Sequence, residues 1–579
     1  MALTPKPDGT LRAIGLTPMT YRVWARARRQ EALEWEEAKA GFWDSAMRSS
    51  SALRAGVLRA LANESAATIG MASATWMWDF EKFYDSVNLE RLVSESIRLG
   101  FCPVILYLSL AIHTSVRLIK VQGHLAEGIN PTTGLVAGDT HAQTLAKLVL
   151  YWALDNYHAK FAGACAKQYI DDIAARVEGL KQDVVRIAVD SALWLKKALE
   201  EASCVVSMKK MALLASSKDL GKEIQQALES GGFKVSHVEF AKDLGLASAA
   251  GRRRCAVVQK SRLKKNSPRV DRIGRFARVV RKASKLFSTG VLSSDVYGCE
   301  AMGVAPTTLR LIRRRGARAT GATTAGSCCT TALAIAYGDY GDPGIAAPAR
   351  MVREWLRIWG QGSACHKRVR RTWELLRPKL DDQKRWLNIR GPVGAMIGTL
   401  KDQGWEPLAP NVWSGPDGQD WEFHSSAGVA EFVRHFENTV RKRLWAKAAQ
   451  HVNAKGLEAG ADLRVLRKHL RKLEKGEFWG EYGLLSCIAC AGLWPRARIA
   501  ASGKPVSPIC ERCGKAEETL EHRFWYCEHN YTILHPDVIM SKRLIKEARR
   551  ACINCPSFWL RGLTPSTWAW ILVLSASLL

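Results

Sequence analysis

Two adjacent aspartates, Asp171 and Asp172, lie within the strand-like run Gln168–Ile173. Like charges on neighbouring residues repel each other, and a strand points successive side chains to opposite faces. The pair therefore either forms a solvated turn or converges on something strongly positive. A third acid, Asp79, lies in the aromatic run Trp76–Phe80, which is typical of a strand.

Three carboxylates meet at one sheet edge if the Asp79 strand lies beside a hairpin whose turn is Asp171-Asp172. Such a cluster is costly unless divalent cations neutralise it, and carboxylate oxygens suit Mg²⁺. Two ions about 3.5–4 Å apart activate an attacking oxygen and stabilise a leaving oxygen in phosphoryl transfer. In this arrangement Asp79, Asp171 and Asp172 would be catalytic ligands of two Mg²⁺ ions, and the solvated turn is the alternative until the order of the other motifs is considered.

The elements that must position these acids fill the first 250 residues. Strands interleave with helices there, without regular βαβ alternation, which predicts an α+β domain around a small antiparallel sheet. Helices are expected over Thr20–Ala40, Asn88–Leu99, Thr140–Tyr157 and Val184–Ala202.

The length and charge of the chain limit its function class. A chain of 579 residues is too long for one hydrophobic core, so two to four domains are expected. The formal net charge of +30 favours a polyanionic partner, nucleic acid before an anionic membrane. The apolar run 568–579 is shorter than the roughly 20 residues that span a bilayer. We expect a nuclear or cytoplasmic protein that is not secreted and has no membrane partner.

A basic segment runs from Arg252 to Lys285 and contains a single acid, Asp271. Its basic residues either form a solvated helix face or localisation tract, or contact a duplex backbone. We identify five of them as nucleic-acid-binding candidates: Arg252, Arg253, Arg254, Lys264 and Lys265. Apolar residues at helical spacing predict a helix whose buried face carries Val270, Ile273, Phe276, Val279 and Val280.

Tryptophans recur between Trp355 and Trp445. Such residues either stack on nucleic-acid bases or fill a hydrophobic core. We expect the core role for this stretch.

The third candidate site is a group of cysteines and one histidine near the C-terminal end. Cys510, Cys513, His522 and Cys527 have the spacing C-x2-C-x8-H-x4-C, which suits a closed tetrahedral zinc site. An alternative Cys₄ grouping joins Cys487-x2-Cys490 to Cys510-x2-Cys513, and Cys552-x2-Cys555 supplies another pair. In a chain without a visible secretory signal, such pairs favour metal over disulfides.

Taken in order, several motifs resemble those of reverse transcriptases, and among them those of non-LTR retrotransposons. Tyr169–Asp172 resembles the Y-x-D-D box, and Asp79–Val87 resembles the first catalytic motif. The remaining motifs follow the family order, and they are the fingers motif Lys6–Ile14, the loop Gly134–Asp139, the lysine Lys210 and the primer-grip hairpin Asp243–Gly245.

The resemblance implies a role for each matching residue. Asp79 and Asp171 would bind both metal ions, and Asp172 would complete the site. Tyr84 would exclude the 2′-hydroxyl of a ribonucleotide. The other nucleotide-binding residues that it implies are Lys6 and Arg12 for the triphosphate, Gly138 of the loop, and Lys210.

The resemblance also implies a right-hand polymerase with a small zinc module. We expect fingers and palm over 1–250, a basic helical thumb over 251–330, a helical linker region over 331–485 and the Cys/His module over 486–560. Glu521–Cys527 resembles the ending of the C-terminal zinc motif of non-LTR elements. The N-terminal endonuclease of such elements is expected to be absent.

The implied activity is RNA-directed DNA polymerisation, a nucleotidyl transfer that adds dNTPs to a DNA primer on an RNA template. The implied cofactors are two Mg²⁺ ions and a structural Zn²⁺. The chain departs from the family at Ala137, where the family has glutamine, and at Val136, where it has proline. The alternative function is therefore a nucleic-acid-binding protein that has lost catalysis.

Overall fold

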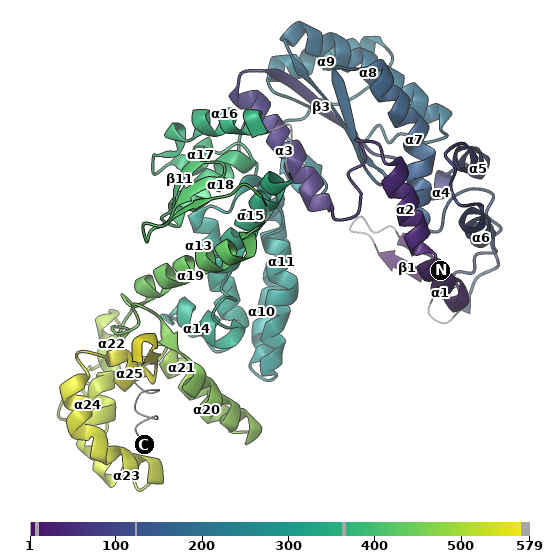
Figure 1. Ribbon diagram of the computed structural model, residues 1–579. Helices are drawn as coiled ribbons and strands as arrows, with labels where there is room; N and C mark the ends of the chain where they lie inside the picture. Colours follow the sequence, from purple (N-terminus) through teal and green to yellow (C-terminus); the bar gives the residue numbers. More distant parts are fainter. Residues whose placement is uncertain (1, 6–10, 122–123, 362–365, 426, 569–579) are drawn as a thin grey trace. The chain divides into compact units, whose positions relative to one another are not determined.

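The structure is a computed structural model that describes residues 2–5, 11–121, 124–361, 366–425 and 427–568. The chain divides into two compact units. Unit 1 comprises Met1–Val258 and Cys365–Ala395, and unit 2 comprises Gln259–Ala364 and Met396–Leu579. Both units mix helices and strands, as the sequence predicts for the first of them (Figure 1).

Unit 1 contains a four-stranded antiparallel sheet in the order β6-β7-β3-β8. Its strands are β3 (Ala72–Trp78), β6 (Ala164–Tyr169), β7 (Asp172–Gly179) and β8 (Ala212–Ala215). Three small antiparallel pairs accompany it: β1 (Ala2–Pro5) with β2 (Leu11–Ile14), β4 (Lys120–Val121) with β5 (His124–Leu125), and β9 (Ala241–Asp243) with β10 (Leu246–Ser248).

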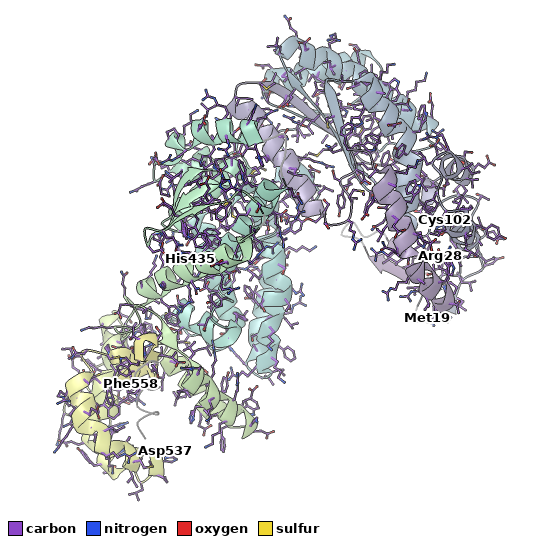
Figure 2. All side chains as sticks on the ribbon, viewed as in Figure 1. Met19, Arg28, Cys102, His435, Asp537 and Phe558 are labelled. Atoms are coloured by element: carbon purple, nitrogen blue, oxygen red, sulfur yellow. The ribbon has the colours of Figure 1, made fainter. Side chains whose placement is uncertain are left out.

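The helices of unit 1 agree with the predicted periodicity, apart from one break. The region expected as one helix over Thr20–Ala40 divides at Arg28 into α1 and α2, and Figure 2 labels Met19 and Arg28 at the two ends of α1. Asn88 caps α5 by accepting a hydrogen bond from the Arg91 N–H (2.9 Å). The helices are α1 (Met19–Ala27), α2 (Arg29–Lys39), α3 (Ala52–Thr68), α4 (Phe83–Ser86), α5 (Leu89–Arg98), α6 (Pro103–His113), α7 (Ala142–Lys160), α8 (Lys181–Glu201), α9 (Lys218–Ser230), α16 (His366–Leu376) and α17 (Arg385–Asn388), with the 3₁₀ turn η3 (Pro378–Leu380).

The main sheet has an apolar face and a polar face because side chains alternate along each strand. Ala74, Trp76 and Trp78 of β3 are buried in one apolar core with α7, α8 and α9. On the opposite face of β3, the Thr75 hydroxyl donates to Asn63 of α3 (3.4 Å). Asp79 directly follows Trp78, so it lies just past the end of a buried strand in the middle of the sheet.

Helix α3 also carries a fully buried carboxylate, Glu64. It accepts hydrogen bonds from the N–H groups of Val393 (2.7 Å) and Gly394 (3.0 Å), at the start of α18 (Pro392–Asp402). Burial raises the pKa of Glu64 to about 7, although these backbone donors act in the opposite direction. Glu64 thus satisfies the orphan N–H groups of a helix end.

Unit 2 is mainly helical and includes a three-stranded sheet, β11-β12-β13. The predicted core role is confirmed for most of the tryptophans, because Trp355, Trp359, Trp405, Trp413 and Trp445 are at most 6% exposed, whereas Trp386 and Trp421 are half-buried. Trp405 and Trp413 pack against the aromatic face of α19.

The long elements of unit 2 are α10 (Val257–Ala277), α13 (Pro306–Ala319), α14 (Cys329–Tyr337), α15 (Pro343–Gly360), α19 (Val429–Ala448), α20 (Arg464–Lys475) and α21 (Trp479–Ala489). The short helices and turns are η1 (Arg281–Ser284), η2 (Phe287–Val291), α11 (Leu292–Asp295), α12 (Cys299–Met302), α22 (Arg496–Ala501), η4 (His522–Tyr526), η5 (Glu528–Thr532), α23 (Pro536–Ser541), η6 (Lys542–Leu544), α24 (Ile545–Ala551), α25 (Pro556–Arg561) and η7 (Ser566–Trp568). The strands are β11 (Glu406–Ala409), β12 (Val412–Ser414), β13 (Asp420–Glu422), β14 (Ala461–Asp462) and β15 (Thr564–Pro565).

One prediction for the basic segment is wrong. Val270 and Ile273 are buried on α10 as expected, but Phe276, Val279 and Val280 are 54%, 73% and 43% exposed. Phe276 lies within α10 but beside its buried stripe, which continues from Ile273 to Gly274 and Ala277. The helix ends at Ala277, so the helical period does not apply to Val279 and Val280.

No helix among the described residues is long and apolar enough to span a membrane. Residues 569–579 of the apolar C-terminal run lie outside the described residues.

Candidate active site and metal centre

The pairing of the main sheet explains how the three predicted carboxylates come together. The register of β3 with β7 ends at Trp78 opposite Ile173, and one further step along it pairs Asp79 with Asp172. The hairpin from β6 to β7 closes with Tyr169 opposite Asp172, which leaves Ile170 and Asp171 in the turn. The sheet therefore sets Asp79 beside the Asp171-Asp172 turn, as the sequence predicts.

The turn itself is strained. Ile170 has φ +60°, a conformation that β-branched residues adopt rarely and at a free-energy cost. The buried Gln168 compensates, since its side-chain amide donates to the Ile170 carbonyl (2.7 Å) and its backbone pairs with Trp43 and Ser45. The spacing of the motifs did not predict that Gln168 holds the turn at Ile170 and Asp171.

Asp79 is fixed by its own backbone and by a lysine. The Asp79 carbonyl accepts from the Ser207 N–H (2.8 Å), and the same segment leads to Lys210. The Lys210 ammonium contacts the Asp79 carboxylate with an Nζ–Oδ1 distance of 3.0 Å. Both side chains stay partly exposed, so the pair is accessible from solvent.

The carboxylates perturb one another. Loss of hydration first, then the neighbouring charge of Asp171, raises the pKa of Asp172 to about 6, with smaller contributions from Asp243 and Asp79. Asp172 nevertheless keeps solvent-accessible surface, so a cation from solvent can reach it. Carboxylate oxygens are the donors that Mg²⁺ prefers, so the chemistry of the three acids fits the ions predicted for them, but their oxygens do not all lie within 4.8 Å of one another as the ligand atoms of a closed site do.

Arg59 of α3 opposes this accumulation of negative charge, and sequence reasoning missed it. Its guanidinium bonds Asp243 of β9 (2.6 Å) and the Lys167 carbonyl of β6 (3.0 Å), and its charge lowers the pKa of Asp172. Asp243 begins the predicted primer-grip hairpin, whose turn residues Leu244 and Gly245 both have positive φ. Arg59 therefore joins the two hairpins, through an ion pair to Asp243 in one and a hydrogen bond to the Lys167 carbonyl in the other.

Tyr84 lies next to the carboxylates. Burial and the charge of Asp171 both raise the pKa of the Tyr84 hydroxyl. The Tyr84 carbonyl accepts from the Leu135 N–H (2.5 Å), which ties the predicted nucleotide loop Gly134–Asp139 to the first motif. Gly134 has φ +89°, and a Cβ at that position would lie 2.6 Å from the Asp85 carbonyl oxygen, so this close approach requires glycine.

The rest of the loop is held by its backbone. The Ala137 carbonyl accepts from the Gly15 N–H (3.3 Å), and Gly138 adopts φ +101° and is exposed. Lys6 lies outside the described residues, and of Arg12 the structure gives only its place in β2. The structure thus brings Tyr84 and Lys210 to the carboxylates, and it leaves the triphosphate role of Lys6 and Arg12 as a prediction.

A buried histidine contacts the loop Gly134–Asp139. His113, at the end of α6, is fully buried, and its Nδ1 accepts from the Val136 N–H (3.0 Å). Its Nε2 lies 3.8 Å from Asp139, too far for a hydrogen bond. Burial lowers the pKa of His113 to about 4, although Asp139 opposes the shift.

The basic candidates have unequal surroundings. Arg253 pairs with the Glu239 carboxylate (2.6 Å), Arg252 donates to the Glu239 carbonyl (2.9 Å) and Arg254 lies over the Trp386 ring (5.0 Å). Lys264 and Lys265 are exposed on α10. The role of all five in nucleic-acid binding stays a prediction.

The predicted zinc ligands converge. The ligand atoms of Cys510, Cys513, His522 and Cys527 all lie within 4.8 Å of one another, with Cys510 and Cys527 sulfurs 3.9 Å apart. Three thiols and one imidazole at this spacing fit a tetrahedral Zn²⁺ ion. Within the part of the chain that the structure describes, this is the one such group of three or more ligands, so the alternative grouping with Cys487 and Cys490 is not assembled.

The local backbone favours the thiolate form of one of the four ligands, Cys513, whereas burial raises the pKa of Cys510. Hydrogen bonding from the Lys515 N–H lowers the pKa of Cys513, because a donor to sulfur stabilises the thiolate. Gly514, with φ +68°, turns the chain between Cys513 and Lys515. By contrast, Cys552 packs with Leu520 and Leu560 in an apolar cluster.

A comparison with known protein families agrees with the geometry of the carboxylate site, which lies within the first 240 residues. Residues 4–240 match the family model described as reverse transcriptase (RNA-dependent DNA polymerase). The chain contains a reverse transcriptase domain. That domain includes Asp79, Asp171, Asp172, Tyr84 and Lys210.

Solved structures give a much weaker likeness. Telomerase from Candida albicans in complex with a fragment of telomeric RNA is 11% identical, with a TM-score of 0.32 over 62% of this chain and 57% of that one. Telomerase from Candida tropicalis in a similar complex is 10% identical, with a TM-score of 0.31 over 78% and 61%. The chain thus spans about three fifths of these structures, and scores this low carry no argument. No curated protein matches the chain.

We expect His113→Gln to remove part of the acid sensitivity of the protein. The lowered pKa means that the unfolded chain takes up a proton near its ordinary value of about 6.5 while the folded chain stays neutral down to about 4. Stability from this group is therefore present at neutral pH and is lost as pH falls through that window. Melting temperatures measured from pH 7.5 to 4.5 should fall less steeply in His113→Gln.

The exposed His424→Gln is the matched control and should keep the wild-type slope. Equal slopes in all three proteins would contradict the role assigned to His113.

We expect the purified chain to contain one zinc ion per molecule and Cys513→Ser to lose it, because three ligands no longer close the tetrahedron. Metal content by mass spectrometry checks this. Cys102→Ser, which removes a thiol outside the cluster, should keep the zinc. Full zinc content in Cys513→Ser would point to a different ligand set.

Proposed function

We propose that the chain is the RNA-directed DNA polymerase of a non-LTR retrotransposon. The observation that carries the proposal is the meeting of Asp79, Asp171 and Asp172 at one sheet edge, inside a reverse transcriptase domain, with Tyr84 and Lys210 beside them. The reaction is the addition of dNTPs to the 3′ end of a DNA primer on an RNA template. It would take place in the nucleus or cytoplasm.

The carboxylates would hold two Mg²⁺ ions, with Asp79 and Asp171 as ligands of both and Asp172 completing the site. When bound, the ions supply activation of the attacking 3′-oxygen and neutralisation of charge on the reacting phosphate. The protein keeps the three acids together through sheet register and the Arg59–Asp243 ion pair. The carboxylate neighbours that help to raise the pKa of Asp172 are charges that a nearby cation would offset.

The neighbouring residues position the nucleotide. Tyr84 presents a half-buried ring next to Asp171, where it would fill the space of a 2′-hydroxyl. Lys210, partly exposed beside Asp79, supplies a positive charge for the triphosphate, as do Lys6 and Arg12 in the resemblance. Gly138 lets the loop backbone approach the nucleotide. Under this proposal unit 1 corresponds to fingers and palm, and the basic segment with Lys264 and Lys265 to the thumb.

The zinc cluster supports the retrotransposon origin, since its ligand spacing is that of the C-terminal motif of non-LTR elements. A closed Cys₃His site has no open coordination position for substrate, so its role would be structural. Local order around four ligands replaces the large core that so short a segment lacks.

A second candidate function is nucleic-acid binding without catalysis. The observation that favours it is Ala137, at the place where the family has glutamine. Against it, the Ala137 carbonyl holds Gly15 through the backbone, so the loop keeps its conformation with alanine. Primer extension by the unmutated chain with Mg²⁺ or Mn²⁺ decides between the two functions.

We expect Asp171→Asn to abolish primer extension while RNA binding stays within about twofold, because phosphate contacts by basic residues supply most of the affinity. Extension of a DNA primer on an RNA template and fluorescence polarisation measure the two properties. Asp190→Asn, an exposed carboxylate on α8, is the matched control and should extend normally. Extension at the wild-type rate by Asp171→Asn would exclude the proposed site.

We expect Tyr84→Ala to extend primers with ribonucleotides as well as deoxyribonucleotides, because the ring that blocks the 2′-hydroxyl is gone. Tyr84→Phe keeps the ring and should keep the discrimination. The ratio of kcat/KM for dNTP and rNTP measures the change. An unchanged ratio in Tyr84→Ala would remove this residue from the nucleotide pocket.

A further inference from the structure

Unit 2 contains a basic cavity outside the candidate active site. Its volume is about 280 Å³, and its walls come from η1, the residues after α13, and the helices α14, α20 and α21, which Figure 1 labels in teal and green. We call it the Tyr482 pocket and define it by Arg281, Lys282, Lys285, Arg471, Tyr482 and Ser486.

Positive charge accumulates around this cavity. Five basic side chains line it against one carboxylate, that of Glu474. One of the five, Arg467, is engaged by Asp339 (3.1 Å) and by the Ala334 carbonyl (2.7 Å). Among the described residues, no ion pair joins a carboxylate to any of the other four, which are Arg281, Lys282, Lys285 and Arg471.

An aromatic ring holds one of these cations in place. The Arg281 guanidinium carbon lies 4.1 Å from the centre of the Tyr482 ring, a close cation–π contact. The Arg281 Nε is buried and makes no hydrogen bond within the described part of the chain. A buried donor without a partner costs free energy, which an anion in the pocket would recover.

The shape of the cavity limits the anion. Its volume is just below the roughly 300–1,000 Å³ of most ligand pockets, so it admits a phosphate with its sugar rather than a duplex. Basic grooves with an aromatic side chain are typical of single-strand binding. The net charge of +30 makes a polyanionic strand the favoured source of that phosphate.

We propose that the Tyr482 pocket binds a backbone phosphate of a single nucleic-acid strand, through Arg281, Lys282 and Arg471. This site belongs to unit 2 alone and does not depend on whether the reverse transcriptase domain extends a primer. It adds a second nucleic-acid site to the one proposed at the carboxylates.

The test compares two double variants of the full chain by fluorescence polarisation, with a labelled 20-nucleotide oligouridine RNA over a salt series. Lys282→Ala/Arg471→Ala removes two pocket cations. Arg434→Ala/Lys442→Ala removes the same charge from exposed positions on α19. The pocket variant should bind several-fold more weakly, and its salt slope should fall by about 0.7, the value for one phosphate of a single strand that is no longer neutralised. The control should lose little affinity.

Two outcomes would overturn the proposal. Equal losses of affinity in both double variants would mean that only overall charge matters. If inorganic phosphate binds in calorimetry and depends on Lys282 and Arg471, while the oligouridine slope stays unchanged, the pocket serves a free phosphate. Asp171→Asn should bind oligouridine as the wild type does, so failure of the polymerase proposal is distinguishable from failure of this one.

Discussion

Keeping three carboxylates together against their mutual repulsion is the constraint on which the rest of unit 1 depends. The antiparallel register of β3 with β7 places Asp79 beside Asp172, and the strained turn at Ile170 adds Asp171. A slip of one residue would turn these side chains to the other face of the sheet and separate them. The buried tryptophans of β3 prevent that slip, because they fill the core on the opposite face.

Buried polar contacts link the pieces of the site that the sheet does not include. Arg59 joins the two hairpins next to the carboxylates, and His113 supports the nucleotide loop through the Val136 N–H. Each contact lies in low-dielectric surroundings, where removing one partner leaves a costly unsatisfied group. These positions therefore order the site without touching a substrate.

Unit 2 differs from unit 1 because it contains few strands and many basic side chains. Tryptophans fill its core around α19, and the ligand atoms of the Cys510–Cys527 cluster converge near its C-terminal end. Around the Tyr482 pocket the cations remain gathered without enough acids to neutralise them. Structural stability alone does not account for such a gathering, which is why we assign it to an anionic partner.

The sequence by itself determined the chemistry of this protein, because residue type and spacing suffice for local patterns. The neighbouring positions of Asp79, Asp171 and Asp172, the helix that starts after Asn88 and the Cys₃His cluster all follow from spacing or periodicity. The tertiary structure alone decided which distant residues support them. Arg59, Gln168 and His113 have no motif of their own, since their roles arise from contacts between elements far apart in the chain. It also decided that Phe276 is exposed, because the buried stripe of α10 continues from Ile273 through Gly274 and Ala277 and leaves Phe276 beside it.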